Sequence, residues 1–172
     1  MRFLSYTIDM EVKHMEILAH EASGDKILLT NDCCPNAAMK NVFQTQFFTC
    51  TLRRIELYNQ HLMQYTVESA ARFLLLHLTI YNHTNEILSM FREDFYLRYD
   101  GEGTEAEEFF HVPHQFPDTY ALKPNEEQRG CLAFIIAADT KRIIFSYTEY
   151  FDDDAEGKTY RLKYDIQQSY SR

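Results

Sequence analysis

The sequence has no tryptophan, only five glycines and four prolines, and no long apolar run. The scarcity of glycine and proline excludes collagen-like and linker-like structure, and it implies that Asn, Asp and Ser form the turns. No stretch approaches the ~18 consecutive apolar residues of a membrane span. Hydrophobic residues still make up 45% of the 172 residues, and aromatic residues 15%, which favours a folded chain rich in strands.

Basic residues are also scarce, with 17 Lys and Arg against 26 Asp and Glu, for a net charge of −9. This balance disfavours direct binding of DNA or RNA, because nucleic-acid-binding surfaces neutralise phosphates with Lys and Arg. It favours a basic protein partner, including one that itself binds nucleic acid. Arg53 and Arg54 lie mid-strand with Lys40 upstream, and three cations are too few for an electrostatic footprint.

The four cysteines are Cys33, Cys34, Cys50 and Cys131, and none forms a CxxC motif. A zinc site is therefore disfavoured, and we expect reduced thiols, with one bridge to Cys50 or Cys131 as the alternative for an exported protein. Charged residues interrupt the first 17 positions, so a secretory segment is not recognisable. The protein is expected to be cytoplasmic if Met1 is the natural start, and exported otherwise.

Signatures of catalysis are missing as well: there is no GxSxG, P-loop, HExxH or glycine-rich dinucleotide turn. A cysteine nucleophile needs a histidine beside it in space, which the sequence does not reveal. His111 and His114 flank Val112-Pro113, and scattered surface and core histidines explain them more simply than a metal site. We expect a protein that is not an enzyme and that has no cofactor.

The most regular stretch is Arg72 to Asn85, RFLLLHLTIYNHTN. Leu74, Leu76, Leu78 and Ile80 share one side of an extended strand, and the opposite side is mixed, so one face is predicted to be in a core. The strand stops at Asn-His-Thr-Asn, a cluster of turn formers.

The remaining alternating patterns predict eight to ten strands and an all-β, immunoglobulin-like antiparallel β-sandwich with an added N-terminal β-hairpin. The hairpin would pair one strand within residues 3–18, bulged near Lys13 and His14, with a second at 26–30. Residues 42–58 are expected to form a long strand or a strand pair that runs through Phe43, Thr45, Phe47, Thr49 and Thr51, and then Ile55 and Leu57. We expect one domain, with hairpin and loop at 1–41, sandwich at 42–165 and a fraying tail at 166–172. Residues 59–68 are expected to form a connection with a helical turn as one option, and residues 100–124 a surface loop.

Two segments carry the resemblance to a family: DFYLRYDGEG, Asp94 to Gly103, and LKPNEEQRGCLAFIIAADTKRIIFSY, Leu122 to Tyr147. They resemble the DUF4352-type immunoglobulin-like domains of Gram-positive bacteria over roughly residues 42–150. The matching positions are Phe95, Leu97, Gly101, Leu122, Pro124, Gly130, Leu132 and Phe134. Asn125 stands where the family has Gly, and Asn also tolerates positive φ. These motifs are architectural. The family is typically exported, and this chain departs from it in its leader, its N-terminal hairpin and its acidic loop.

Negative charge is concentrated in two segments. Residues 93–108 carry a net of −6 and residues 149–156 a net of −5, so the rest of the chain sums to +2. One interpretation is that these acids keep a β protein soluble and protect sheet edges. Another is a face for a basic partner, and a third is a Ca²⁺ site at Asp152, Asp153, Asp154 and Glu156, although the ligand spacing of an EF-hand is missing.

The leading functional hypothesis is a non-catalytic protein-binding module with an acidic, aromatic loop surface. The alternatives are an acidic inhibitor from a mobile element or phage, which mimics phosphate charge against a nucleic-acid-binding protein, and an exported surface module. Aromatic residues in connections are candidate anchors, although they could also cover sandwich edges. The predicted partner-binding residues are Glu102, Glu105, Glu107, Glu108, Phe109, Phe110, Glu149, Asp152, Asp153, Asp154 and Glu156.

Overall fold

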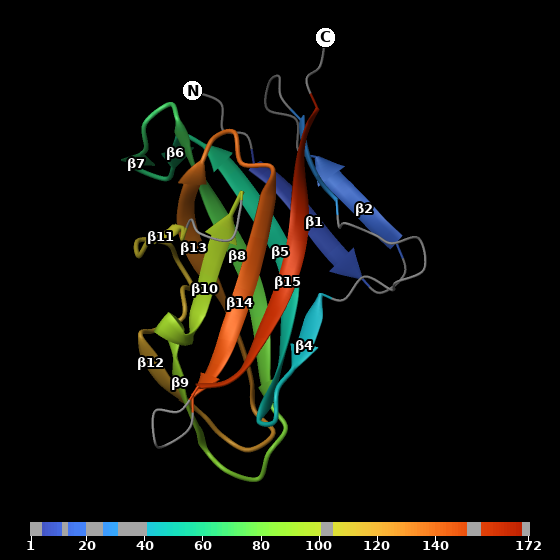
Figure 1. Cartoon of the computed structure of the whole chain (residues 1–172), viewed down its shortest axis with the longest axis vertical. Coiled ribbons are helices and arrows are strands. Elements are labelled where there is room, and N and C mark those ends of the chain that lie inside the picture. The colour runs from blue at the N-terminus through green and yellow to red at the C-terminus, as the bar shows by residue number, and fades with distance from the viewer. Residues whose placement is uncertain are drawn as a thin grey trace.

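The computed structural model of the chain describes residues 5–11, 14–19, 26–30, 41–100, 105–150 and 156–169. Two antiparallel sheets pack face to face around a shared core (Figure 1). The prediction of an all-β antiparallel sandwich is therefore confirmed.

The larger sheet has seven strands among the described residues, in the order β11-β13-β8-β5-β1-β2, with β4 also pairing with β5. Its strands are β1 (Ser5–Glu11), β2 (His14–Ala19), β4 (Val42–Gln44), β5 (Phe48–Asn59), β8 (Ala71–Asn82), β11 (Glu107–Glu108) and β13 (Glu127–Ala137). The long central strands β5, β8 and β13 are paired over almost their full length and form the centre of this sheet.

The second sheet has the order β10-β14-β15-β3. Its strands are β3 (Lys26–Thr30), β10 (Phe95–Tyr99), β14 (Arg142–Tyr150) and β15 (Glu156–Ser169). Two short pairs stand apart from these sheets: β6 (His61–Leu62) with β7 (Tyr65–Thr66), and β9 (Leu88–Phe91) with β12 (Thr119–Leu122). A 3₁₀ turn, η1 (Arg92–Asp94), joins β9 to β10.

The core lies between the sheets and confirms the alternation predicted for β8. Leu74, Leu76, Leu78 and Ile80 are each at most 2% exposed and pack with residues of both sheets. The opposite side of β8 is more buried than its mixed composition indicates, because Phe73 and Leu75 belong to a second apolar cluster. Phe109 and Val112 pack in that cluster, so β8 is enclosed on both sides at this end.

The strand pair predicted as one option for 42–58 is confirmed, because β4 and β5 are separate, paired strands. In the first half of β5, Phe48, Cys50 and Leu52 are the buried residues rather than Thr49 and Thr51, and the inward positions change parity before Ile55 and Leu57. The reason is a β-bulge: Leu52 pairs with Leu78, but Arg54 pairs with His77. One extra residue, Arg53, is thus accommodated in β5, and every later side chain changes face.

The N-terminal hairpin is present, but its strands differ from those expected. β1 and β2 pair with each other across the register Ile8↔Ile17, and β1 also pairs with β5. The phase shift near Lys13 therefore separates two antiparallel strands and is not a bulge within one strand. β3 pairs with β15 in the other sheet and does not complete this hairpin.

Three further expectations need correction. Residues 59–68 form the β6–β7 pair and no helical turn. The stretch 100–124 is not wholly a surface loop, because β11 and β12 lie in it and Phe116 is 3% exposed. The predicted tail is a strand as far as Ser169, since β15 continues beside β3 and Ile166 is buried. In the second and third cases pairing with a distant segment supplies order that the local sequence does not signal.

Two of the predicted turn and packing positions are confirmed. Asn125 has a φ of 58°, as its place in the turn requires. At Gly130, an added Cβ would lie 2.9 Å from the ring of Phe116, so only glycine lets that ring pack against β13.

Candidate functional site

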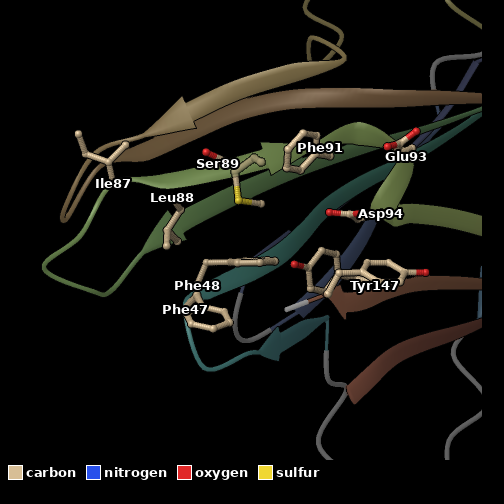
Figure 2. Close-up of a pocket in the computed structure, with 11 residues that line it drawn as sticks. Phe47, Phe48, Ile87, Leu88, Ser89, Phe91, Glu93, Asp94 and Tyr147 are labelled. Atoms are coloured by element: carbon tan, nitrogen blue, oxygen red, sulfur yellow. The ribbon is translucent and has the colours of Figure 1, made fainter. Parts of the chain in front are cut away.

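A pocket of about 780 Å³ lies at one end of the sandwich, where β9 and η1 face the end of β14 and the turn before β5 (Figure 2). Its walls are mainly aromatic and aliphatic, with two carboxylates. The lining residues are Phe47, Phe48, Ile87, Leu88, Ser89, Met90, Phe91, Glu93, Asp94, Tyr147 and Tyr150.

The chain places Asp94 in this pocket through two local features. The 3₁₀ turn η1 ends at Asp94, and β10 then starts at Phe95, which pairs with Tyr147 of β14. Asp94 is therefore held next to the last residues of β14. Figure 2 shows its carboxylate pointing into the space between Phe91 and Tyr147.

Asp94 is a partly desolvated carboxyl group. Burial, and secondly the neighbouring charge of Glu93, raise its pKa from 3.8 to about 6. Within the described part of the chain, its side chain has neither a hydrogen bond nor an ion pair. Burial also raises the pKa of the nearby Tyr147 hydroxyl, and the charge of Asp94 adds to this shift. A donor or a cation is therefore the chemistry that this position lacks.

The rim of the pocket is apolar and open to solvent. Ile87 is 65% exposed, Tyr150 51% and Phe91 41%, although all three are large hydrophobic side chains. Single exposed apolar residues are common on proteins, but several that converge on one pocket are typical of a binding surface.

The predicted acidic loop is only partly described, and Glu102 lies outside the described residues. Glu105 forms an isolated bridge with Arg98, and their side chains approach to 3.4 Å. Glu107 and Glu108 form β11 at the edge of the larger sheet, and the Glu108 carboxylate lies 3.7 Å from Arg92. Arginines of the same chain thus already accompany two of the predicted carboxylates.

The two predicted aromatic anchors have different surroundings. Phe109 packs against Tyr65 and Phe73, with ring centroids 5.0 and 4.9 Å away, and belongs to the cover of the larger sheet. Phe110 is 51% exposed, and the guanidinium of Arg92 lies 4.4 Å from its ring centroid. Only Phe110 is therefore available to a partner.

The second acidic segment contains one residue whose predicted exposure is wrong. Glu149 is 1% exposed, and its Oε1 accepts hydrogen bonds from the backbone amide of Gln46 and the hydroxyl of Tyr160. It therefore anchors the turn before β5 and is not accessible to a partner. Asp152, Asp153 and Asp154 lie outside the described residues, and Glu156 begins β15. The candidate Ca²⁺ site consequently lies outside the described part of the chain too.

None of the predicted partner-binding residues lines this pocket. The acids that line the pocket, Glu93 and Asp94, belong to the charged segment 93–108. The partner-binding residues predicted in that segment lie further along it, in the loop after Asp94. Phe91, the last residue of β9, also lines the pocket. The signal that could have found the site is the step Phe91-Arg92-Glu93-Asp94, a polar interruption directly before a strand of the core.

A cysteine, a histidine and a glutamate come together on the outer face of the larger sheet. Cys131 of β13 is paired with His77 of β8, whose Nε2 lies 3.0 Å from Oε2 of Glu56 on β5. The thiol, however, donates a hydrogen bond to the carbonyl oxygen of Pro113. Burial, and then the charge of Glu56, raise the pKa of Cys131 to about 11, so this thiol stays protonated near neutral pH.

Clusters of metal ligands and membrane-spanning helices are both absent from the described residues. No group of three or more His, Cys, Asp or Glu suited to a metal ion occurs within the described ranges. His111 instead stacks on Tyr65, with ring centroids 5.0 Å apart. Within those ranges, too, no helix has the length and apolarity needed to cross a membrane.

Comparison with known proteins yields a fold and no established activity. No model of a known protein family matches the chain, and no curated protein matches it. Among solved structures, YcdA of Bacillus subtilis, described as a putative lipoprotein, is similar with a TM-score of 0.58 and 13% identity over 73% of this chain. The chain spans only 38% of the length of that protein.

Two further bacterial structures share the fold. YjhA of Bacillus subtilis matches with a TM-score of 0.57 and 14% identity, over 73% of this chain and 97% of that one. A functionally unknown protein of Listeria monocytogenes matches with a TM-score of 0.50 and 13% identity, over 72% and 79% of the two chains. At such identities the similarity is one of architecture alone: this chain shares the fold of these bacterial proteins.

Proposed function

We propose that this protein is a non-catalytic protein-binding module whose pocket receives a side chain that is apolar along its length and cationic at its end. The pocket has the matching composition, with aromatic walls and carboxylates at Glu93 and Asp94. Lysine and arginine combine an apolar stem with a charged head, and they also stack on aromatic rings such as Tyr147.

The observation that carries the proposal is the state of Asp94. Its carboxyl group is removed from water enough to raise its pKa to about 6, yet no described residue compensates it. A cation from a partner would restore the interaction that burial removed, and it would favour the ionised form. The exposed Ile87, Phe91 and Tyr150 would contribute apolar contact area around that ion pair.

Catalysis receives no support from the groups that suit it best. The Cys131 thiol donates to a backbone carbonyl and has a raised pKa, whereas a nucleophilic cysteine needs a lowered one. The carboxylate of Glu56 is held by Arg54, His77 and Tyr58. These contacts favour a structural role for the cluster.

The proposal also concerns the family of the protein and its location. The DUF4352-type resemblance of the sequence agrees with the fold shared with bacterial β-sandwich proteins, and we infer a relationship to that family. The description of YcdA as a lipoprotein favours a module that acts outside the cytoplasm. The phosphate-mimicking inhibitor remains a prediction without a specific supporting observation, since Glu105 and Glu108 lie beside arginines of the same chain.

The proposal is tested by selecting ligands from a phage-displayed library of random peptides with the purified protein. We expect enrichment of Lys or Arg next to aliphatic or aromatic residues, and affinities that weaken as salt increases. Asp94→Asn should lose most of this selectivity, because it removes the buried charge but keeps the side-chain size.

Asp139→Asn is the matched control, because Asp139 is exposed in the turn between β13 and β14 and its substitution changes the net charge equally. Retention of the same peptides by the Asp94→Asn variant would contradict the proposal. Equal losses in the two variants would also contradict it, since they would indicate a general effect of net charge.

A further inference from the structure

A second pocket, of about 480 Å³, lies on the outer face of the larger sheet, between β5, β8, β13 and the segment at Pro113 and His114. This pocket is lined mainly by basic residues. The first pocket, called the aromatic pocket below, is instead lined by aromatic and aliphatic residues and two carboxylates. The lining residues of the second pocket are Arg53, Arg54, His77, Leu78, Thr79, Pro113, His114, Arg129 and Gly130.

The bulge in β5 is the cause of this concentration of cations. In a regular strand, consecutive arginines would point to opposite faces of the sheet. Here the register shift between Leu52 and Arg54 lets Arg53 and Arg54 line the same pocket. Pairing across the neighbouring strands completes the group, because Arg54 lies opposite His77 and Thr79 lies opposite Arg129.

The pocket is basic even though the protein is acidic. Three guanidinium groups and two imidazoles line it, and its lining contains no carboxylate. Two of the arginines are in ion pairs: Arg54 with Glu56 at 2.8 Å, and Arg129 with Glu127 at 2.8 Å. Arg53 has no ion pair with any described residue, so its charge is not compensated within that part of the chain.

An independent observation comes from Thr79. This residue is only 6% exposed, and its Oγ1 is buried without a hydrogen-bond partner among the described residues. Nε of Arg54 is likewise buried without a hydrogen-bond partner among the described residues. Buried polar atoms are normally satisfied, so two unsatisfied donors in one basic pocket indicate a missing acceptor.

We propose that this pocket binds a small phosphate-type oxyanion, with the hydroxyl of Thr79 and the guanidinium of Arg53 as its principal donors. Donors reach the pocket from three strands, which suits a tetrahedral anion with acceptor oxygens in several directions better than a planar carboxylate. A polyanion such as nucleic acid is disfavoured, because the net charge of −9 repels an extended chain of phosphates.

The test uses inorganic phosphate added to the full chain at constant ionic strength, with chloride as the balancing anion and amide chemical shifts as the readout. We expect saturable shifts confined to β5, β8, β13 and the residues around His114. Thr79→Val keeps the shape of the side chain and removes the hydroxyl, so it should weaken phosphate binding about tenfold without loss of folding.

Two charge reversals form a matched pair. Arg53→Glu should abolish saturable binding, whereas Arg161→Glu, an equal change of charge at an exposed position of β15, should keep the dissociation constant within about twofold. Absence of saturation in the unmodified protein would overturn the proposal. So would equal weakening by Arg161→Glu, or unchanged binding in Thr79→Val, which would indicate that water satisfies this hydroxyl.

This site is independent of the aromatic pocket. Asp94→Asn should leave phosphate binding unchanged, and Arg53→Glu should leave peptide selection unchanged. The two proposals can therefore fail separately.

Discussion

The two pockets differ in charge, in walls and in the irregularity that creates them. The aromatic pocket depends on the 3₁₀ turn η1, which places Asp94 beside β14, and the basic pocket depends on the bulge at Arg53. Regular strands alternate between core and solvent, so they do not concentrate one kind of polar side chain. The candidate sites therefore form where strand pairing is irregular, and not in the segments richest in charge.

The pockets also differ in how their charges are compensated. Asp94 has no partner among the described residues, whereas Arg54 shares Glu56 with His77 and Tyr58. The first arrangement reduces folded-state stability where Asp94 is ionised, and the second increases it where Glu56 is ionised. Mutations in each pocket should therefore respond to pH in opposite directions.

The largest expected effect comes from Asn82, whose side chain holds the turn after β8. It ends β8, the strand that carries Thr79, and its side-chain amide binds the carbonyl oxygens of Glu86, Leu122 and Lys123. Its Oδ1 accepts bonds from the amide and the hydroxyl of Thr84. Asn82→Ala should lower the free energy of unfolding by ~3 kcal/mol, because several buried backbone groups lose their partners.

Urea denaturation measures this change, with Asn85→Ala as the control in the same turn, since Asn85 is exposed. If the two variants have equal stability, the Asn82 side chain does not hold the turn.

Glu56→Gln should have the next largest effect and tests the ion pairs of Glu56 with Arg54 and His77 beside the basic pocket. Burial alone would raise the pKa of Glu56, but its hydrogen bond and charge interaction with His77, aided by Arg54 and Tyr58, lower it below its ordinary value. The stabilisation by this carboxylate is therefore full above its unfolded-state pKa and is lost as pH falls through the lower folded-state pKa.

We expect Glu56→Gln to lower the free energy of unfolding by ~2 kcal/mol at pH 7, because charge-assisted hydrogen bonds are lost. The two proteins should become equally stable in acid, as shown by thermal unfolding across pH. A deficit that is constant with pH would indicate lost packing rather than lost charge.

The smallest expected effect is an increase in folding stability when Asp94 is replaced. The folded-state pKa of Asp94 is raised from 3.8 to about 6, so the folded protein binds this proton more tightly than the unfolded chain does. Stability consequently falls as pH rises from about 4 through 6, when the desolvated carboxyl ionises. Asp94→Asn should be more stable than the unmodified protein by ~1 kcal/mol at pH 7, a figure reduced for the partial exposure of the side chain.

Thermal unfolding at pH 7 and pH 4 checks this prediction, and the advantage should disappear at the lower pH. Asp139→Asn should change little at either pH, since that carboxylate is exposed. A destabilised Asp94→Asn variant at pH 7 would show that the ionised carboxyl has a stabilising partner.

Local patterns in the sequence predicted the parts of the fold that depend on local chemistry. The alternation of Leu74 to Ile80 identified the buried face of β8, and the Asn-rich sequence after it identified a turn. They did not predict that β3 joins the opposite sheet or that Phe109 and Val112 pack on the outer face of the larger one. Those arrangements depend on segments far apart in the chain, whose pairing leaves no periodic signal of its own.

For the candidate sites, the sequence by itself determined the inventory: an acidic chain with aromatic residues in its connections and a pair of arginines inside a strand. Only the tertiary structure decided that Glu149 is buried, that Asp94 is desolvated without a partner and that Arg53 and Arg54 share a pocket. The physical reason is that charge and periodicity are properties of the residues, whereas desolvation and strand register are set by neighbours that folding brings together.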